Sequence, residues 1–302
     1  MNTFKPLDVA VIDAPSPEIL KSPDGHGGYT PELEAADTPD ALRLACGAAL
    51  RDFPKGLRLT AKQREDKARE NDANHTWAIN HLDRFTNQSP THECTTHDLR
   101  ACFEAAWNKQ RGLKFDEGPK KGYRYTQSAQ GSVWVSPLSV YSEANPGQWG
   151  GAGIMQVLNI ACRRGFLPDK IQPADYGFRH YLQGTAGQGN SNQSSGKFVR
   201  VSGFPDGWEE TAKLLMPDEV VVTTDWEEAL DLIHWGHCLG YARSGHSIPP
   251  AVYNSESKAI GYVDSYDVVR WDSLATFQRA VRGGVYCIIS VKTPDDWSKP
   301  AG

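Results

Sequence analysis

The segment NQSPTHECTTHDLRACFEAAWNKQRG, residues 87–112, decides the fold of this chain. From Cys94 onward its apolar residues recur at spacings of three and four, which is typical of a helix with one buried face. Gly112 follows the pattern and is expected to end the helix, because glycine readily adopts the conformation that closes one. A cysteine therefore stands at the start of a helix, where unpaired N–H groups and the helix dipole favour a thiolate. The apolar positions are Leu99, Cys102, Phe103, Ala106 and Trp107.

Further elements can be predicted on the C-terminal side of this helix. Apolar spacing and a closing Gly165 predict a second helix over 154–164, and a third is predicted over 225–234, with Thr223 or Thr224 as its cap. Short strand-like runs come last, which favours an α+β domain with helices first and an antiparallel β half after them. These runs cover residues 238–241, 251–253, 259–263 and 285–291.

Composition excludes several classes of function. The 302 residues carry a formal net charge of −5, and the densest basic run, 62–69, contains Glu65 and Asp66, so no nucleic-acid partner is expected. No run approaches the length of an apolar membrane span, and residues 1–20 lack the apolar core of a secretory signal. The six cysteines include no C-x-x-C pair and are expected to be reduced thiols. We expect a protein that is cytoplasmic or virion-associated, with no membrane contact and no cofactor.

The chain divides by composition into three parts. Residues 1–58 are rich in proline and glycine and are predicted to form an extended arm with one short helix at 40–50, although a disordered tail is the alternative. Residues 59–74 form a charged helix or linker. The compact domain covers 75–302 and includes the polar, flexible loop QGTAGQGNSNQSSGK at 183–197.

A nucleophilic cysteine needs a base, and the base needs a partner that orients it. His246 lies at a transition from loop to strand, and Asp264 ends a predicted strand, so antiparallel pairing can bring both side chains together. Metal binding is the competing interpretation, but neither available set has the spacing of a zinc module, and no metal is expected. The remaining cysteines of the helices and strands are expected to fill the core. The two sets are His92, Cys94 and His97, and His234, His237, Cys238 and His246.

Several segments resemble the papain-like cysteine peptidases. NQSPTHEC resembles the segment around the family's nucleophile, and Gln88 lies six residues before Cys94, as in that family. The resemblance implies that the Gln88 amide donates to the oxyanion of the reaction. The stretch SPLSVYSEANPGQWGGAGIMQVLNIACRRGFLP, residues 136–168, is similar to the family's segment through its Gly-Gly pair. Gly150 and Gly151 would then pair with the substrate main chain.

The C-terminal half carries the rest of the resemblance. GHS, residues 245–247, is similar to the segment of the family's catalytic histidine, and VDSYD, 263–267, to its Asn-Ser-Trp-Gly segment. His246 would thus be the base, and Asp264 would stand where the orienting asparagine normally stands. Together these segments imply a papain-like α+β fold, with a helical half that carries the nucleophile and an antiparallel β half.

Two functions follow from this resemblance. The first is a thiol peptidase or amide hydrolase that acts on a peptide or protein substrate through a Cys-His-Asp triad. The second is a catalytically silent structural or assembly protein, such as a bacteriophage virion component, that binds protein neighbours or copies of itself through residues 1–58. Departures from the family's motifs favour the second. They are Glu93 before the cysteine, Thr95 after it, Tyr266 and Asp267 in the last motif, and the prolines at 249 and 250.

Overall fold

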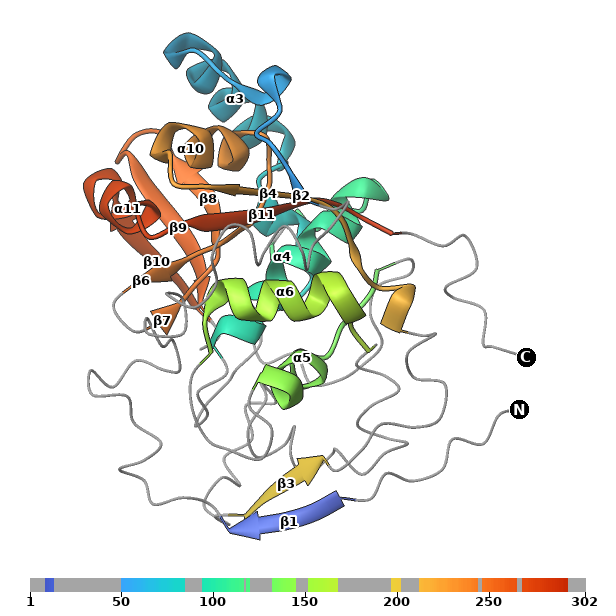
Figure 1. The fold of residues 1–302 in the computed structure, drawn as a ribbon. Coiled ribbons are helices and arrows are strands. Elements are labelled where there is room, and N and C mark those ends of the chain that lie inside the picture. The colour runs from blue at the N-terminus through green and yellow to red at the C-terminus, as the bar shows by residue number, and fades with distance from the viewer. Residues whose placement is uncertain are drawn as a thin grey trace.

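The computed structural model describes residues 9–13, 50–84, 94–116, 118–119, 132–144, 152–167, 197–201, 212–243, 246–264 and 268–292. Helices α4, α5 and α6 lie together on one side, and the C-terminal strands and helices form the other side (Figure 1). The predicted α+β organisation, with helices before antiparallel strands, is confirmed.

The helices are α3 (Ala61–Asn74), α4 (Cys94–Gln110), α5 (Pro137–Ala144), α6 (Ile154–Arg164), α10 (Trp226–His234) and α11 (Leu274–Val281), with short 3-10 helices η2 (Lys55–Leu57) and η3 (Ala78–His81). The strands are β1 (Val9–Asp13), β2 (Leu50–Arg51), β3 (Lys197–Val201), β4 (Pro217–Thr223), β5 (Leu239–Gly240), β6 (Ala242–Arg243), β7 (His246–Ser247), β8 (Pro250–Asn254), β9 (Ala259–Asp264), β10 (Val268–Ser273) and β11 (Val285–Val291).

The helices α4 and α6 end where glycine was predicted to end them. Gly112 has a φ of 69° and Gly165 a φ of 85°, a left-handed region that side chains with a Cβ rarely adopt. At Gly165 a Cβ atom would also lie 1.9 Å from the carbonyl oxygen of Ala212. Both helix ends are therefore confirmed, and the turn after α6 requires glycine for two independent reasons.

The central sheet, in the order β2-β4-β11-β5, separates two apolar cores. Because side chains alternate along a strand, Val220 and Ile288, which are opposite each other, face the helices α4 and α6. Their neighbours Val221 and Cys287 face the opposite way, toward α10 and α11. Alternate residues of β11 thus close both cores, and α4 lies against this strand for much of its length.

A second antiparallel sheet, β8-β9-β10, and the small ladder β6-β7 complete the β half. Pro250 begins β8, and the register shifts between Pro250 and Val252, so the missing donor falls at a bulge. The carbonyl of Pro249 still accepts from the N–H of Val263 at 3.1 Å. The two prolines therefore do not interrupt the pairing that carries Asp264 into place at the end of β9.

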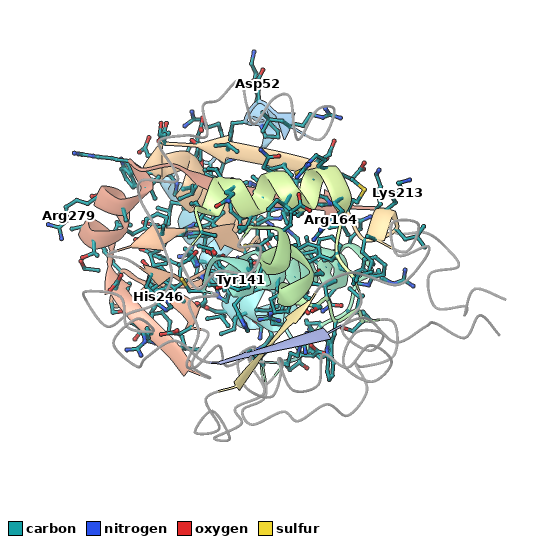
Figure 2. All side chains as sticks on the ribbon, turned by 60° about the horizontal axis from the view of Figure 1, so that its bottom comes forward. Asp52, Tyr141, Arg164, Lys213, His246 and Arg279 are labelled. Atoms are coloured by element: carbon teal, nitrogen blue, oxygen red, sulfur yellow. The ribbon has the colours of Figure 1, made fainter. Side chains whose placement is uncertain are left out.

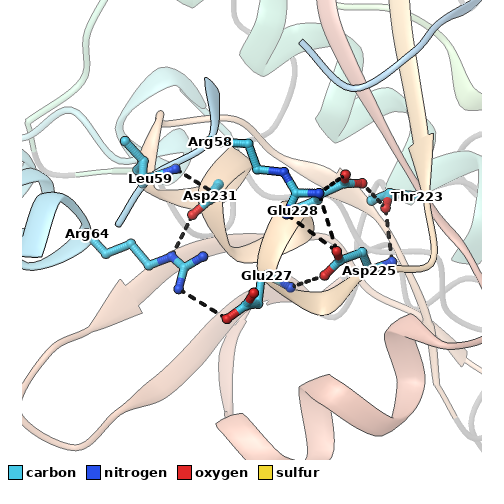
Figure 3. A network of polar contacts seen from close by, with 8 residues as sticks. All are labelled: Arg58, Leu59, Arg64, Thr223, Asp225, Glu227, Glu228 and Asp231. Carbon is cyan, nitrogen blue, oxygen red and sulfur yellow. Dashed lines mark hydrogen bonds and ion pairs between the residues drawn. The ribbon is translucent and has the colours of Figure 1, made fainter. Parts of the chain in front are cut away.

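The segment that leads into α3 is held to α10 by ion pairs (Figure 3). Arg58 contacts Asp225 at 3.4 Å and Glu228 at 2.5 Å. The buried carboxylate of Asp231 accepts from Arg64 at 2.6 Å and from the backbone N–H of Leu59 at 3.1 Å. Residues 50–51 also pair in parallel with β4. The described part of 50–74 thus packs on the β half, and the boundaries at 58 and 74 stay predictions.

The start of α10 differs from the prediction. Neither Thr223 nor Thr224 is its cap, because the carboxylate of Asp225 accepts from the N–H of Glu227 at 2.8 Å and makes Asp225 the capping residue. Thr223 lies two residues before this cap, and its hydroxyl accepts from the backbone N–H of Asp225 at 3.0 Å.

The strand β1 pairs antiparallel with β3 (Figure 1). Residues 9–13 of the predicted arm therefore pair with a strand of their own chain. The rest of 1–49 falls outside the described residues, and with it the helix expected at 40–50 except for Leu50, which lies in strand β2 rather than in a helix. Of the loop predicted at 183–197 only Lys197 is described, and it begins strand β3. In the described ranges, no helix combines the length and the apolar character that crossing a membrane requires.

Candidate active site

Cys94 is the first residue of α4, the helix at the centre of the molecule. Its side chain is buried, and the helix begins there as the apolar spacing predicted. The backbone N–H groups of the first turn of a helix have no partner within the helix, and the positive end of the helix dipole favours negative charge nearby. The fold therefore places this thiol at the positive end of the central helix.

His246 begins β7 and lies where the strands meet the helical half (Figure 2). Its ring nitrogen Nε2 is 3.1 Å from Oδ1 of Asp264, a residue 18 positions later in the chain. Burial opposes protonation of the ring, but hydrogen bonds with Asp264 and Cys94, and the charges of both, raise the pKa of His246 to about 9. Asp264 and Cys94 thus both interact with one imidazole, which is protonated at neutral pH.

The two ring nitrogens have different partners. Because Asp264 takes Nε2, the nitrogen that can serve the Cys94 thiol is Nδ1. All three side chains come from different elements, namely the start of α4, the start of β7 and the end of β9. The structure therefore brings together the three residues that the sequence indicated as a nucleophile, a base and an orienting group.

Asp264 has a second partner, Arg270, whose Nε donates to Oδ2. Asp264 pairs with Val268 in the β9-β10 ladder, and Arg270 lies two positions beyond Val268, on the same face of the strand. Burial alone would raise the pKa of Asp264, but the hydrogen bonds and positive charges of His246 and Arg270 lower it. Asp264 therefore stays a carboxylate, with one oxygen for each partner.

The Asp264→Asn variant tests the charge on this site. Asparagine still accepts a hydrogen bond from Nε2, but it carries no negative charge. The positive charge of Arg270 then has no carboxylate to balance it at this position. We expect the pKa of His246 to fall from about 9 toward its ordinary value of 6.5, so that more of the ring is neutral at neutral pH. The change is measured by an NMR titration of the ring protons of His246, over a pH range that extends below 6.5 and above 9.

Glu256→Gln is the matched control for this titration. Glu256 is an exposed carboxylate in the turn before β9, at the opposite end of that strand from Asp264. Its removal should leave the titration of His246 unchanged. If Asp264→Asn also leaves the pKa of His246 in place, the carboxylate does not set the charge of the ring.

Three of the predicted site residues cannot be placed. Gln88, expected to be the oxyanion donor, and Gly150 and Gly151, expected to bind the substrate main chain, lie outside the described residues. Their roles stay predictions. Cys94, His246 and Asp264 are each next to an undescribed residue, at 93, 245 and 265.

Arg270, Asp98 and Ser247 belong to the surroundings of the site but were not predicted from the sequence. Arg270 lies on β10, a strand that the sequence reading missed because charged residues interrupt its apolar run. Asp98 follows Cys94 by one helical turn, and this spacing is a usable signal: a carboxylate four residues after a helix-start cysteine shares its face.

The groups considered as metal ligands have other partners. His234 Nδ1 lies 2.8 Å from the carbonyl oxygen of Leu230, and His237 Nε2 lies 3.0 Å from Nζ of Lys109. Burial lowers the pKa of His97 well below the ordinary value, and the nearby positive charges lower it further. Among the residues that the structure describes, no three acidic, cysteine or histidine side chains gather as a metal site. His92 is not described.

The other cysteines of the helices and strands lie in the apolar cores, as predicted: Cys102 and Cys162 in the first and Cys287 in the second. Burial and the hydrogen bond with Cys238 raise the pKa of Cys102 well above its ordinary value. Burial likewise raises the pKa of Cys287. These two thiols stay protonated at neutral pH.

Comparisons with known proteins identify two solved structures of similar fold. One is xylellain, a cysteine protease from Xylella fastidiosa, with a TM-score of 0.48 and 15% identity over 70% of this chain and 83% of that chain. Another is digestive procathepsin L 3 from the larval midgut of Tenebrio molitor, with a TM-score of 0.49 and 7% identity over 82% of this chain and 77% of that chain. No family model and no curated protein matches the chain. Both structural similarities are weak, and the proposed function does not rest on them.

Proposed function

We propose that this chain is a papain-like thiol peptidase or amide hydrolase with Cys94 as nucleophile, His246 as base and Asp264 as orienting group. One observation carries the proposal: a buried imidazole interacts with a carboxylate on Nε2 and with the thiol of a helix-start cysteine. The raised pKa of His246 keeps the ring positive at neutral pH, and a positive ring stabilises a neighbouring thiolate.

The chemistry follows from this arrangement. The Cys94 thiolate attacks the carbonyl carbon of the substrate, and the carbonyl oxygen takes the negative charge. The imidazolium of His246 then gives its Nδ1 proton to the leaving amine, and the acyl group remains on sulfur as a thioester. Neutral His246 next takes a proton from water, whose oxygen attacks the thioester, and the released thiolate and imidazolium restore the starting state.

The remaining groups act on charge and position. Asp264 fixes the tautomer and orientation of the ring and favours its protonated form. Oxyanion stabilisation would come from the backbone N–H of Cys94, at the positive end of α4, and from the amide of Gln88. Gly150 and Gly151 would pair with the main chain of a peptide substrate. The contributions of Gln88 and the two glycines rest on the family resemblance.

Iodoacetamide at neutral pH tests the proposal without knowledge of the substrate. We expect Cys94 in the folded protein to be alkylated at least about ten times faster than Cys102, Cys238 or Cys287, because the thiolate is the reactive form. Peptide mass spectrometry at successive times identifies each labelled cysteine. Cys94→Ala should remove the fast phase.

Cys162→Ala is the matched control, since this buried thiol on α6 has no role in the proposed reaction. It should leave the fast phase intact. If Cys94 reacts only after denaturation, the site is silent, and the alternative of a structural or assembly protein that binds neighbours through residues 1–58 replaces the enzyme.

A further inference from the structure

A second buried carboxylate, Asp98, lies close to the proposed triad. It follows Cys94 by one turn of α4, and its side chain is only 1% exposed. Residues four apart share one face of a helix, so Asp98 and Cys94 face the same part of the β half. Burying a carboxylate costs free energy unless hydrogen bonds compensate it. The hydrogen-bond partners of Asp98 therefore identify the segments that it joins.

The hydrogen-bond partners of Asp98 lie on its own helix, directly before β6 and in β7. Oδ2 accepts from the backbone N–H of Tyr241 at 3.0 Å and from the hydroxyl of Ser247. Oδ1 accepts from the thiol of Cys102, one turn further along α4, at 3.5 Å. Ser247 directly follows His246, and the two residues make up β7. One carboxylate therefore connects the nucleophile helix to the strand that carries the base.

The segment that Asp98 holds, residues 241–248, is joined at its two ends by hydrogen bonds. The backbone of Ile248 donates to the carbonyl oxygen of Tyr241 at 3.0 Å, and the Ser247 hydroxyl lies 3.2 Å from the same oxygen. The β6-β7 ladder, in which Arg243 pairs with His246, lies within this segment. Because Asp98 binds both sides of the ladder, a shift of β7 along α4 would break two of its hydrogen bonds.

We propose that Asp98 is a positioning residue, whose carboxylate fixes β7 on α4 and so holds the ring of His246 opposite the Cys94 thiol. The inference rests on the proposed function, since it assigns Asp98 a role in the same site. Asp264 orients the ring by its Nε2 atom, and Asp98 fixes the backbone from which the ring extends. The triad is thus held by two carboxylates, Asp264 on the ring of His246 and Asp98 on the next residue of the same strand.

The electrostatic setting of Asp98 fits this role. Its titratable neighbours are Cys102, which donates a hydrogen bond, and His246, which acts through its charge; the hydroxyl of Ser247 and the backbone N–H of Tyr241 donate the other hydrogen bonds. Burial raises the pKa of Asp98 to about 7, although these partners oppose the rise. At neutral pH Asp98 is therefore about half ionised, and its hydrogen bonds and the positive ring of His246 favour the ionised form.

Two substitutions, Asp98→Ala and Ser247→Ala, test the inference, and Asp98→Asn tests for rescue. We expect Asp98→Ala to slow the iodoacetamide reaction of Cys94 about ten-fold, because a displaced imidazole no longer stabilises the thiolate. The pKa of His246, followed by NMR, should fall in the same variant, as the ring loses its contact with the thiol. Asp98→Asn keeps an oxygen that accepts from Ser247 and should recover most of the reaction rate. Ser247→Ala, a smaller change, should give a smaller effect in the same direction.

Asp231→Ala is the matched control. Asp231 is equally buried and accepts from Arg64 and from the N–H of Leu59, but it lies on α10, outside the site. Its loss should lower stability without changing the Cys94 reaction or the His246 titration. If Asp98→Ala only lowers stability in the same way, the positioning role is refuted. If wild-type Cys94 does not react at all, the proposed function fails, while the His246 titration still decides the role of Asp98.

Discussion

Replacing His246 with alanine should reduce hydrolysis of fluorescein-labelled casein by about 10³-fold, within the range of a lost general acid and base. In the proposed reaction the imidazolium of His246 stabilises the thiolate and also gives the proton to the leaving amine. The substitution removes both functions together. Alkylation of Cys94 by iodoacetamide at neutral pH should slow in parallel, since it depends on the thiolate alone. The two assays together separate the loss of nucleophile from the loss of acid catalysis.

His237→Ala is the matched control for this experiment. His237 is also buried and has a polar partner, Lys109, near the opposite end of α4 from Cys94. Its replacement should affect stability but neither assay. A His246→Ala protein that cleaves casein at the wild-type rate would show that another group acts as the base.

The central helix and the cysteine at its start could be predicted because their signals are local. The spacing of apolar residues from Leu99 to Trp107 depends on neighbours within two turns, and Gly112 marks the end of the helix by its own conformational freedom. The residues Cys94, His246 and Asp264 followed from the family resemblance, because each lies in a short segment whose order along the chain could be recognised.

The groups that tune the site could not be predicted, since their contacts join distant segments. Asp98 and Ser247 are 149 positions apart, and no local pattern pairs them. Arg270 meets Asp264 only through the register of β9 and β10, and β10 is an edge strand whose polar residues hide its alternation. The same reason explains why the ion pairs between the 58–64 segment and α10 were missed.

The sequence also gave no indication that the polar face of α4 is buried. Periodicity assigned one apolar face, but the structure buries nearly the whole helix, including Arg100 and Glu104. A charged residue is compatible with the core only where its partner arrives from elsewhere, and here Arg84 comes from the segment after η3. The spacing of residues within a helix cannot reveal a charge partner that comes from a distant segment.

Glu104 is the centre of that buried cluster. Its Oε1 accepts from Arg84 at 2.9 Å and from the backbone N–H of Val135 at 3.0 Å, and its Oε2 accepts from Arg100 at 2.5 Å. All three charged side chains are at most 3% exposed. One carboxylate therefore compensates two buried guanidinium groups and ties α4 to the segment before α5.

Glu104→Gln should lower the free energy of unfolding by about 3 to 5 kcal/mol, the cost of leaving buried charges without their counter-ion. The glutamine keeps the shape of the side chain, so the loss reports charge and hydrogen bonding rather than a cavity. Urea denaturation followed by circular dichroism gives the free energy of unfolding for each variant.

Glu143→Gln provides a matched comparison, because Glu143 also binds two arginines, Arg163 and Arg164, but its side chain is 30% exposed. Water compensates the exposed pair, so the loss there should stay below about 1 kcal/mol. Equal losses in the two variants would mean that burial does not make the Glu104 cluster more costly to break. A large loss at Glu104 alone would show that the stability of α4 depends on charges that its apolar spacing does not reveal.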